Sequence, residues 1–124
     1  MTRLRFPKLV AFALCVPVIV QVQGCKESNP LETVSVSLKN TDVYQYPTVG
    51  GDEDGVRIST QPNHYSISEI RRNAETNWVA VYVYRPAAGF IGSDYAELEI
   101  VTGSDGASPP TNIHKVALHF VVHD

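Results

Sequence analysis

The sequence predicts a small all-β domain, an antiparallel two-sheet sandwich of about seven strands, preceded by a signal peptide that is cleaved. Short segments in which apolar and polar residues alternate recur along the chain, and turn-forming residues separate them roughly every 8 to 12 residues. No long amphipathic helix is visible. With 124 residues, 44% of them hydrophobic, the chain has room for one such core and for no second domain.

The first half of the domain contains four predicted strands. In the first, Val34, Val36 and Leu38 alternate with hydroxyl side chains, which is typical of a half-buried strand. An acidic loop that contains glycine separates the second from the third. The fourth fits a strand period and also a helical one, and we favour a strand. These strands cover residues 33–38, 43–46, 56–60 and 64–72.

Residues 77–84 give the strongest strand signal, with valines on one face and Trp78, Ala80, Tyr82 and Tyr84 on the other. Because both faces are apolar, we expect a central strand that is covered on both sides. Two further strands, residues 95–102 and 113–122, close the domain. Their predicted inward residues are Ala96, Leu98, Ile100, Val116, Leu118, Phe120 and Val122.

Residues 1–24 have the features of a secretory signal peptide. A basic start is followed by an uncharged apolar run from Leu9 to Val20, which is shorter than the roughly 20 residues of a membrane-spanning helix. The sequence Val-Gln-Gly-Cys, ending at Cys25, resembles the lipobox of bacterial lipoproteins. The resemblance implies cleavage between Gly24 and Cys25 and acylation of Cys25 with chains such as palmitate. Residues 25–30 would then be the lipidated cysteine and a tether, and residues 31–124 the sandwich.

The charge of the mature chain argues against two classes of partner. Removal of the three basic leader residues leaves 7 basic residues against 13 acidic ones, a net charge of −6. Nucleic acids and anionic lipid surfaces bind through positive patches, so we expect neither as a direct ligand. The lipid anchor would hold the protein in the cell envelope. By resemblance to lipoprotein sorting, Lys26 after the lipidated cysteine is compatible with the outer membrane.

The segment from Tyr84 to Leu98, with the Asp105-Gly106 turn and the closing strand, resembles bacterial Ig-like or cadherin-like repeat domains. The resemblance implies an Ig-like sandwich. Its turn residues also make physical sense: a proline ends the strand, two glycines allow a tight crossing, a phenylalanine plugs the open end and an aspartate accepts turn amides. These structural residues are Pro86, Gly89, Phe90, Gly92 and Asp94.

The candidate metal ligands do not form a strong pattern. His119 and His123 on one strand face lie about 13 Å apart, too far to share an ion. A loose calcium site is the better alternative for an extracellular sandwich. Its candidate ligands are Asp52, Asp54, Asp94 and Asp105. We expect no cofactor.

Motifs of catalysis are also missing from the sequence, so we expect a non-enzymatic protein. Glu97 and Glu99 alternate on one strand about 7 Å apart, a separation that overlaps glycosidase carboxylates, but solvated glutamates are the ordinary interpretation.

Aromatic residues are the better indication of function, because tyrosine and tryptophan are strong anchors at protein and sugar surfaces. The alternative is that they line a second core face. The sequence therefore predicts a lipid-anchored binding or structural module for an envelope or extracellular protein or glycan. Calcium-dependent or carbohydrate binding is the alternative, and a small envelope enzyme comes last. The candidate aromatic residues are Tyr44, Tyr46, Trp78, Tyr82, Tyr84 and Tyr95.

Overall fold

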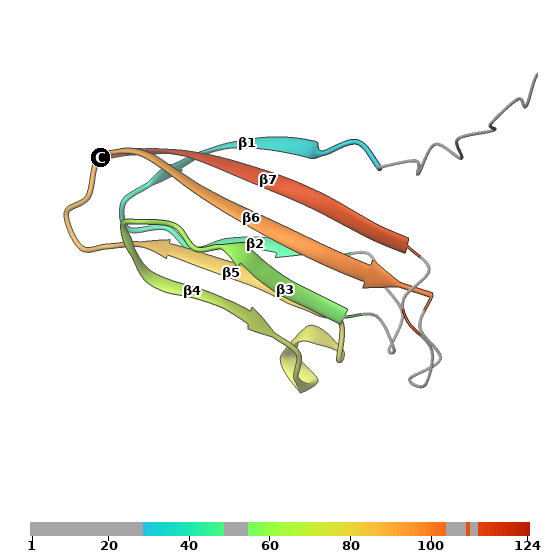
Figure 1. Cartoon of the computed structure of the whole chain (residues 1–124). Coiled ribbons are helices and arrows are strands. Elements are labelled where there is room, and N and C mark those ends of the chain that lie inside the picture. Colours follow the sequence, from blue (N-terminus) through green and yellow to red (C-terminus); the bar gives the residue numbers. More distant parts are fainter. Residues whose placement is uncertain (1–28, 49–54, 104–108, 110–111) are drawn as a thin grey trace, which may run out of the picture.

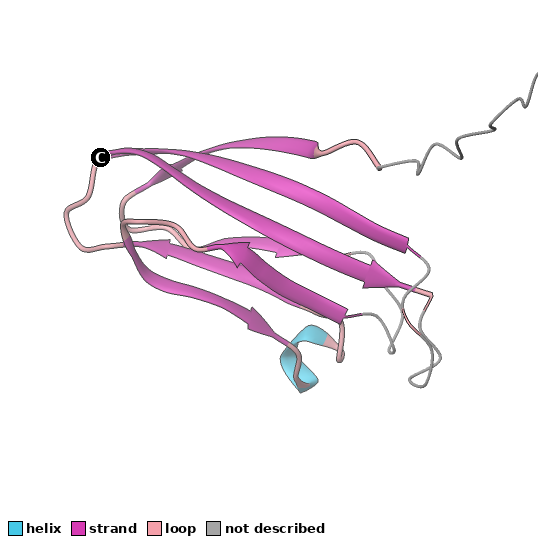
Figure 2. Cartoon of the chain, viewed as in Figure 1, coloured by secondary structure: helices cyan, strands magenta, loops and turns pink. Residues whose placement is uncertain are grey.

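The computed structural model describes residues 29–48, 55–103, 109 and 112–124. In this part of the chain, two sheets pack face to face (Figure 1). Apart from one short 3-10 helix, the regular structure that is described consists of strands (Figure 2). The predicted all-β sandwich of seven strands in two sheets is confirmed. No described helix is long and apolar enough to cross a membrane.

The two sheets contain four and three strands. The four-stranded sheet has the order β1 (Glu32–Lys39), β7 (Asn112–His123), β6 (Gly92–Thr102) and β3 (Gly55–Thr60). The three-stranded sheet has the order β2 (Tyr44–Pro47), β5 (Val81–Pro86) and β4 (Tyr65–Arg71). The 3-10 helix η1 (Ala74–Thr76) lies between β4 and β5. The segment with the ambiguous period is therefore a strand, as favoured.

The topology is that of an Ig-like sandwich. The orders β7-β6-β3 and β2-β5-β4 correspond to the strands G-F-C and B-E-D of the immunoglobulin fold. One ladder departs from the expected antiparallel pattern, since β1 runs parallel to β7 over its whole length. The reason is that the chain crosses to the other sheet directly after β1, so the first strand pairs with the last one instead of its successor.

The strand predicted at residues 77–84 begins later than expected. β5 starts at Val81, whereas Asn77 and Trp78 form a turn with positive φ values of 51° and 63°. Trp78 therefore does not share a strand face with Tyr82. The expectation of a central, covered strand is confirmed, because β5 lies between β2 and β4 and its first four residues are buried on both faces.

The core lies between the sheets and contains the predicted inward residues of β6 and β7. Tyr82 and Tyr84 of β5 are fully buried and face them from the three-stranded sheet. The Tyr84 ring stacks on Phe120 at a centroid distance of 3.9 Å, and Tyr44 meets Phe120 edge-on at 5.7 Å. Three aromatic rings therefore join the two sheets.

Leu118→Ala should lower the free energy of unfolding by about 2 to 5 kcal/mol, because Leu118 is fully buried and its loss leaves a cavity. Val121→Ala is the matched control on the same strand. Val121 is exposed, so its replacement should change stability by no more than about 0.5 kcal/mol. Urea unfolding of both variants measures the difference, and equal losses would contradict the packing described for β7.

Candidate binding site

The six candidate aromatic residues fall into four groups. Tyr82 and Tyr84 are buried in the core, as the alternative interpretation of a core face expects. Tyr44 and Tyr46 are half-buried and pack against the core. Tyr95 is half-buried on the outer face of β6, edge-on to His119. Trp78 is exposed by 62%.

Trp78 lies on a turn whose backbone is held by hydrogen bonds. The Asn73 side chain accepts from the backbone N–H groups of Glu75 and Thr76, and the Thr76 hydroxyl accepts from the N–H of Asn73. This is a capping box. The N–H of Trp78 donates to the carbonyl of Asn73 at 2.8 Å. Hydrogen bonds therefore fix the backbone of this turn, and the indole that it carries is not part of the core.

The backbone of this turn is strained at two consecutive residues. Asn77 tolerates the left-handed region because its short polar side chain suits it, but a bulky residue such as Trp78 at φ 63° is a genuine outlier. The residues that follow are fixed as well: the N–H of Val79 donates to the carbonyl of Thr76, and the carbonyl of Ala80 accepts from both the N–H and the hydroxyl of Thr48. Strain of this kind, held in place by surrounding contacts, is concentrated at functional sites.

A polar cluster lies at the same end of the sandwich. Glu32 bonds through one carboxylate oxygen to His114 Nε2 at 2.9 Å, and the Tyr46 hydroxyl donates to the other at 3.4 Å. Burial, and then the charge of Glu32, raises the pKa of Tyr46. The cluster borders a cavity of about 350 Å³. We call this end the tether end, because Asn29 docks there by donating to Asn112 and to the carbonyl of Ile113.

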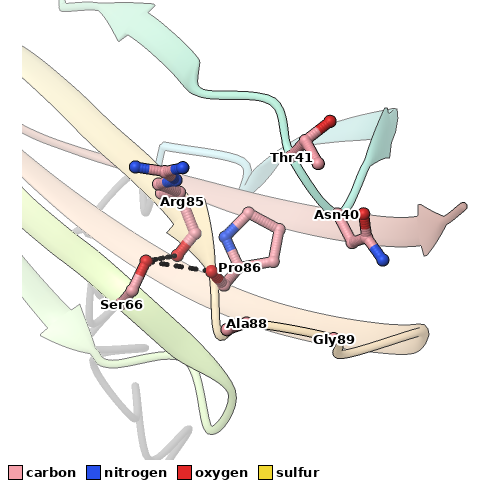
Figure 3. Close-up of a pocket in the computed structure, with 7 residues that line it drawn as sticks. All are labelled: Asn40, Thr41, Ser66, Arg85, Pro86, Ala88 and Gly89. Carbon is pink, nitrogen blue, oxygen red and sulfur yellow. Dashed lines mark hydrogen bonds between the residues drawn. The ribbon is translucent and has the colours of Figure 1, made fainter.

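A second cavity, of about 390 Å³, lies at the opposite end (Figure 3). Asn40 and Thr41 line it from the crossing after β1, and Arg85 lines it from β5. The Ser66 hydroxyl is committed to the carbonyl oxygens of Arg85 and Pro86, as the dashed lines in Figure 3 show. The lining residues include no carboxylate, histidine or cysteine. This cavity therefore has no acid and base pair for catalysis.

Asp94 is a buried structural residue. One carboxylate oxygen accepts the N–H groups of Asn63 and Tyr95, and the other accepts the N–H of His64 and the Tyr84 hydroxyl. The predicted role of accepting turn amides is therefore seen in the structure. Two donors already occupy each carboxylate oxygen of Asp94, which leaves little capacity to coordinate calcium.

The other residues of this turn lie between the end of β5 and the start of β6. Pro86 is the last residue of β5. Gly89 and Gly92 have positive φ values of 75° and 140°, which L side chains rarely adopt. Phe90 packs against the core and stacks on His64 at 4.2 Å. Phe90 thus covers the core at this end of the sandwich, beside the cavity that Pro86 and Gly89 line.

The two glutamates of β6 are not both solvated, contrary to expectation. Glu99 is only 7% exposed and pairs with Arg57 at 2.6 Å, whereas Glu97 accepts from the Tyr95 hydroxyl at 3.0 Å and lies 3.9 Å from Lys115. The partner of Glu99 lies on the neighbouring strand β3, and the partners of Glu97 lie on β6 itself and on β7. They form structural pairs on the outer face of the sheet.

Several predicted site residues lie outside the described part of the chain: Gly24, Cys25, Asp52, Asp54 and Asp105. Within the described residues, no three His, Cys, Asp or Glu side chains come close enough to hold a metal ion.

Comparison with known proteins gave no matching family model and no matching curated protein. Among solved structures, an endo-fucoidan hydrolase from glycoside hydrolase family 107 is 14% identical with a TM-score of 0.47, covering 73% of this chain but 12% of the hydrolase. A cysteine protease inhibitor from Entamoeba histolytica is 13% identical with a TM-score of 0.43, covering 75% of this chain and 95% of the inhibitor. At these low values neither likeness bears on activity.

The buried tyrosines should make the protein less stable in alkali. Burial raises the pKa of Tyr82 to about 12, and burial together with the charge of Asp94 raises the pKa of Tyr84 further. Above pH 10, the ordinary pKa of a tyrosine, the unfolded chain releases these protons while the folded chain retains them. The free energy of unfolding should therefore fall by about 1.4 kcal/mol per pH unit for each tyrosine.

Urea unfolding between pH 8 and pH 11 measures this slope. In Tyr82→Phe, the free energy of unfolding should fall less steeply above pH 10, because one of the two titrating hydroxyls is gone. Below pH 10 its dependence on pH should match that of the wild type. An unchanged slope in Tyr82→Phe would show that its hydroxyl titrates alike in both states.

Proposed function

We propose that this chain is a bacterial lipoprotein, held in the cell envelope by acyl chains on Cys25, whose Ig-like sandwich is a non-enzymatic binding module. The observation that supports binding is Trp78, an exposed indole on a hydrogen-bonded turn with a strained backbone. A large apolar side chain held outside the core costs stability and solubility, so a ligand contact is a physical reason for it.

The tether keeps this contact close to the membrane. Asn29 is docked on β7, so only residues 26–28 separate it from Cys25. Four steps along an extended chain span at most about 14 Å. The tether end of the sandwich, where β5 also begins next to the Trp78 turn, therefore stays near the lipid surface. Because Trp78 lies at this same end, a component of the cell envelope is the class of ligand that this arrangement favours.

We propose an uncharged glycan chain as the ligand. An indole presents a flat apolar face that fits the apolar face of a pyranose ring, and its N–H remains available as a donor. The net charge of the mature chain, −6 by subtraction of the leader's three basic residues, disfavours anionic polymers. The acceptors and donors of Glu32, His114 and Asn112 at the same end offer polar contacts to sugar hydroxyls.

Intrinsic fluorescence tests this proposal directly, because Trp78 is the one tryptophan of the chain. Titration with cello- and chito-oligosaccharides should shift its emission to the blue with a saturable dependence on concentration, since stacking removes the indole from water. Trp78→Gly should abolish the heat of binding in calorimetry. It should preserve or raise the melting temperature, because glycine adopts this φ without strain.

Ile91→Ala is the matched control, since Ile91 is exposed by 56% at the opposite end of the sandwich. It should bind like the wild type. Emission that responds to vesicles and to none of the glycans would assign Trp78 to the lipid surface. Binding that survives Trp78→Gly would remove this residue from the site.

Cys25→Ala should release the protein from the membrane fraction and abolish labelling with a palmitate analogue, because the thiol is the proposed site of acylation. Cys15→Ala, within the apolar run, is the matched control and should remain anchored and labelled. Fractionation of cells followed by immunoblotting measures both. Anchoring that persists in Cys25→Ala would contradict the lipoprotein assignment.

A further inference from the structure

The four edge strands of the sandwich differ in how well they are protected against pairing with another chain. Unprotected edges recruit further strands, and proteins blunt them with short length, proline, bulges or charges. β2 has four residues and ends at Pro47. β3 has a register shift after Ile58 and carries Arg57, and β4 has a register shift after Tyr65 and carries Glu69 and Arg71.

β1 has charges only at its two ends, Glu32 and Lys39, and it has no proline and no register shift. It pairs with β7 in an unbroken register over all eight residues, and residues 33–38 contain no charge and no proline. Its alternating valines face the core, and Thr33, Ser35 and Ser37 are exposed. β1 is thus a long, regular edge whose middle six residues are uncharged, the kind that pairs readily with a strand from another molecule.

The hydrogen bonds of Lys39 show which backbone groups of this edge are free. The Lys39 N–H donates to the Asp42 carboxylate and its carbonyl accepts from the Asp42 N–H, so both groups of Lys39 point away from β7. Backbone groups alternate in direction along a strand, so those of Thr33, Ser35 and Ser37 point the same way. Within the described residues, these outward-pointing groups make no hydrogen bond.

The sequence of this edge is suited to a second copy of itself. Thr-Val-Ser-Val-Ser over residues 33–37 reads nearly the same in both directions. In an antiparallel pair centred on Ser35, Thr33 lies opposite Ser37 and Val34 lies opposite Val36, so hydroxyl residues meet hydroxyl residues and valines meet valines. All three residues with free backbone groups become hydrogen-bonded pairs, each exchanging two bonds. A register shifted towards Lys39 would need groups that Asp42 already occupies.

We propose that two copies of this protein pair through β1, antiparallel and centred on Ser35, so that their four-stranded sheets join into one continuous sheet. Such an interface is isologous, with the same strand contributing from each copy, as two-fold symmetry requires. It is independent of the proposed glycan contact, because it involves another strand and needs neither Trp78 nor the lipid anchor.

Cysteine cross-linking of the full chain tests the register. Cys15→Ala and Cys25→Ala are introduced first, so that one added thiol is alone in the chain. Ser35→Cys should form a disulfide-linked dimer on oxidation, because hydrogen-bonded antiparallel pairs place their Cα atoms about 5.5 Å apart, within disulfide range. Ser37→Cys is the matched control. Its two copies lie four residues apart along the ladder, about 13 Å, and should stay unlinked.

Sedimentation of the same background gives a second, independent measurement. It should show twice the mass of one chain, and Ser35→Lys should return it to a monomer with an unchanged melting temperature, since two like charges then meet at the symmetry axis. Thr60→Lys, on the protected edge β3, should leave the dimer intact. A monomer at millimolar concentration, or equal cross-linking of Ser35→Cys and Ser37→Cys, would overturn the proposal.

Discussion

The two sheets of this protein are joined through Tyr84. Much of the structure depends on two contacts of its side chain, a ring stack and a hydrogen bond. The ring stacks on Phe120 of the opposite sheet, and the hydroxyl donates to the buried carboxylate of Asp94. Asp94 in turn holds the crossing between β3 and β4 through the N–H groups of Asn63 and His64. One aromatic side chain thus links the packing between the sheets to the hydrogen bonds that Asp94 makes at one end of the sandwich. Hydrogen bonds are electrostatically stronger in a buried site than in water.

Because these contacts complete the core at the Asp94 end, the opposite end of the sandwich is not needed for that purpose. The turn that carries Trp78 is satisfied by its own hydrogen bonds and contributes no buried residue before Ala80. Its strain therefore has no part in forming the core, and the stable sandwich can hold an exposed indole in an unfavourable backbone conformation. The docking of Asn29 places the same end beside the tether. The fold thereby separates the part that provides stability from the part available for binding.

Much of the fold could be predicted because strands have a period of two and this core is built from it. The inward residues of β6 and β7 follow from alternation alone, whereas residues 65–71, a strand in the structure, also fit a helical period. The candidate site was harder. Alternation continued through Trp78 into Tyr82, and nothing local distinguished the exposed indole from the buried phenols. The capping pattern of Asn73 and Thr76, two polar residues three apart, was the signal that could have shown where the turn ends.

The sequence by itself determined the strands, the acidic character and the lipobox-like junction, because these depend on local periodicity, composition and short motifs. Only the tertiary structure decided that Glu99 is covered and paired with Arg57, that Asp94 is filled with donors, and that β1 lies parallel to β7. Each of these facts joins residues that are far apart in the chain. Long-range pairing depends on how strands are distributed between two sheets, and a pattern of local alternation carries no information about that distribution.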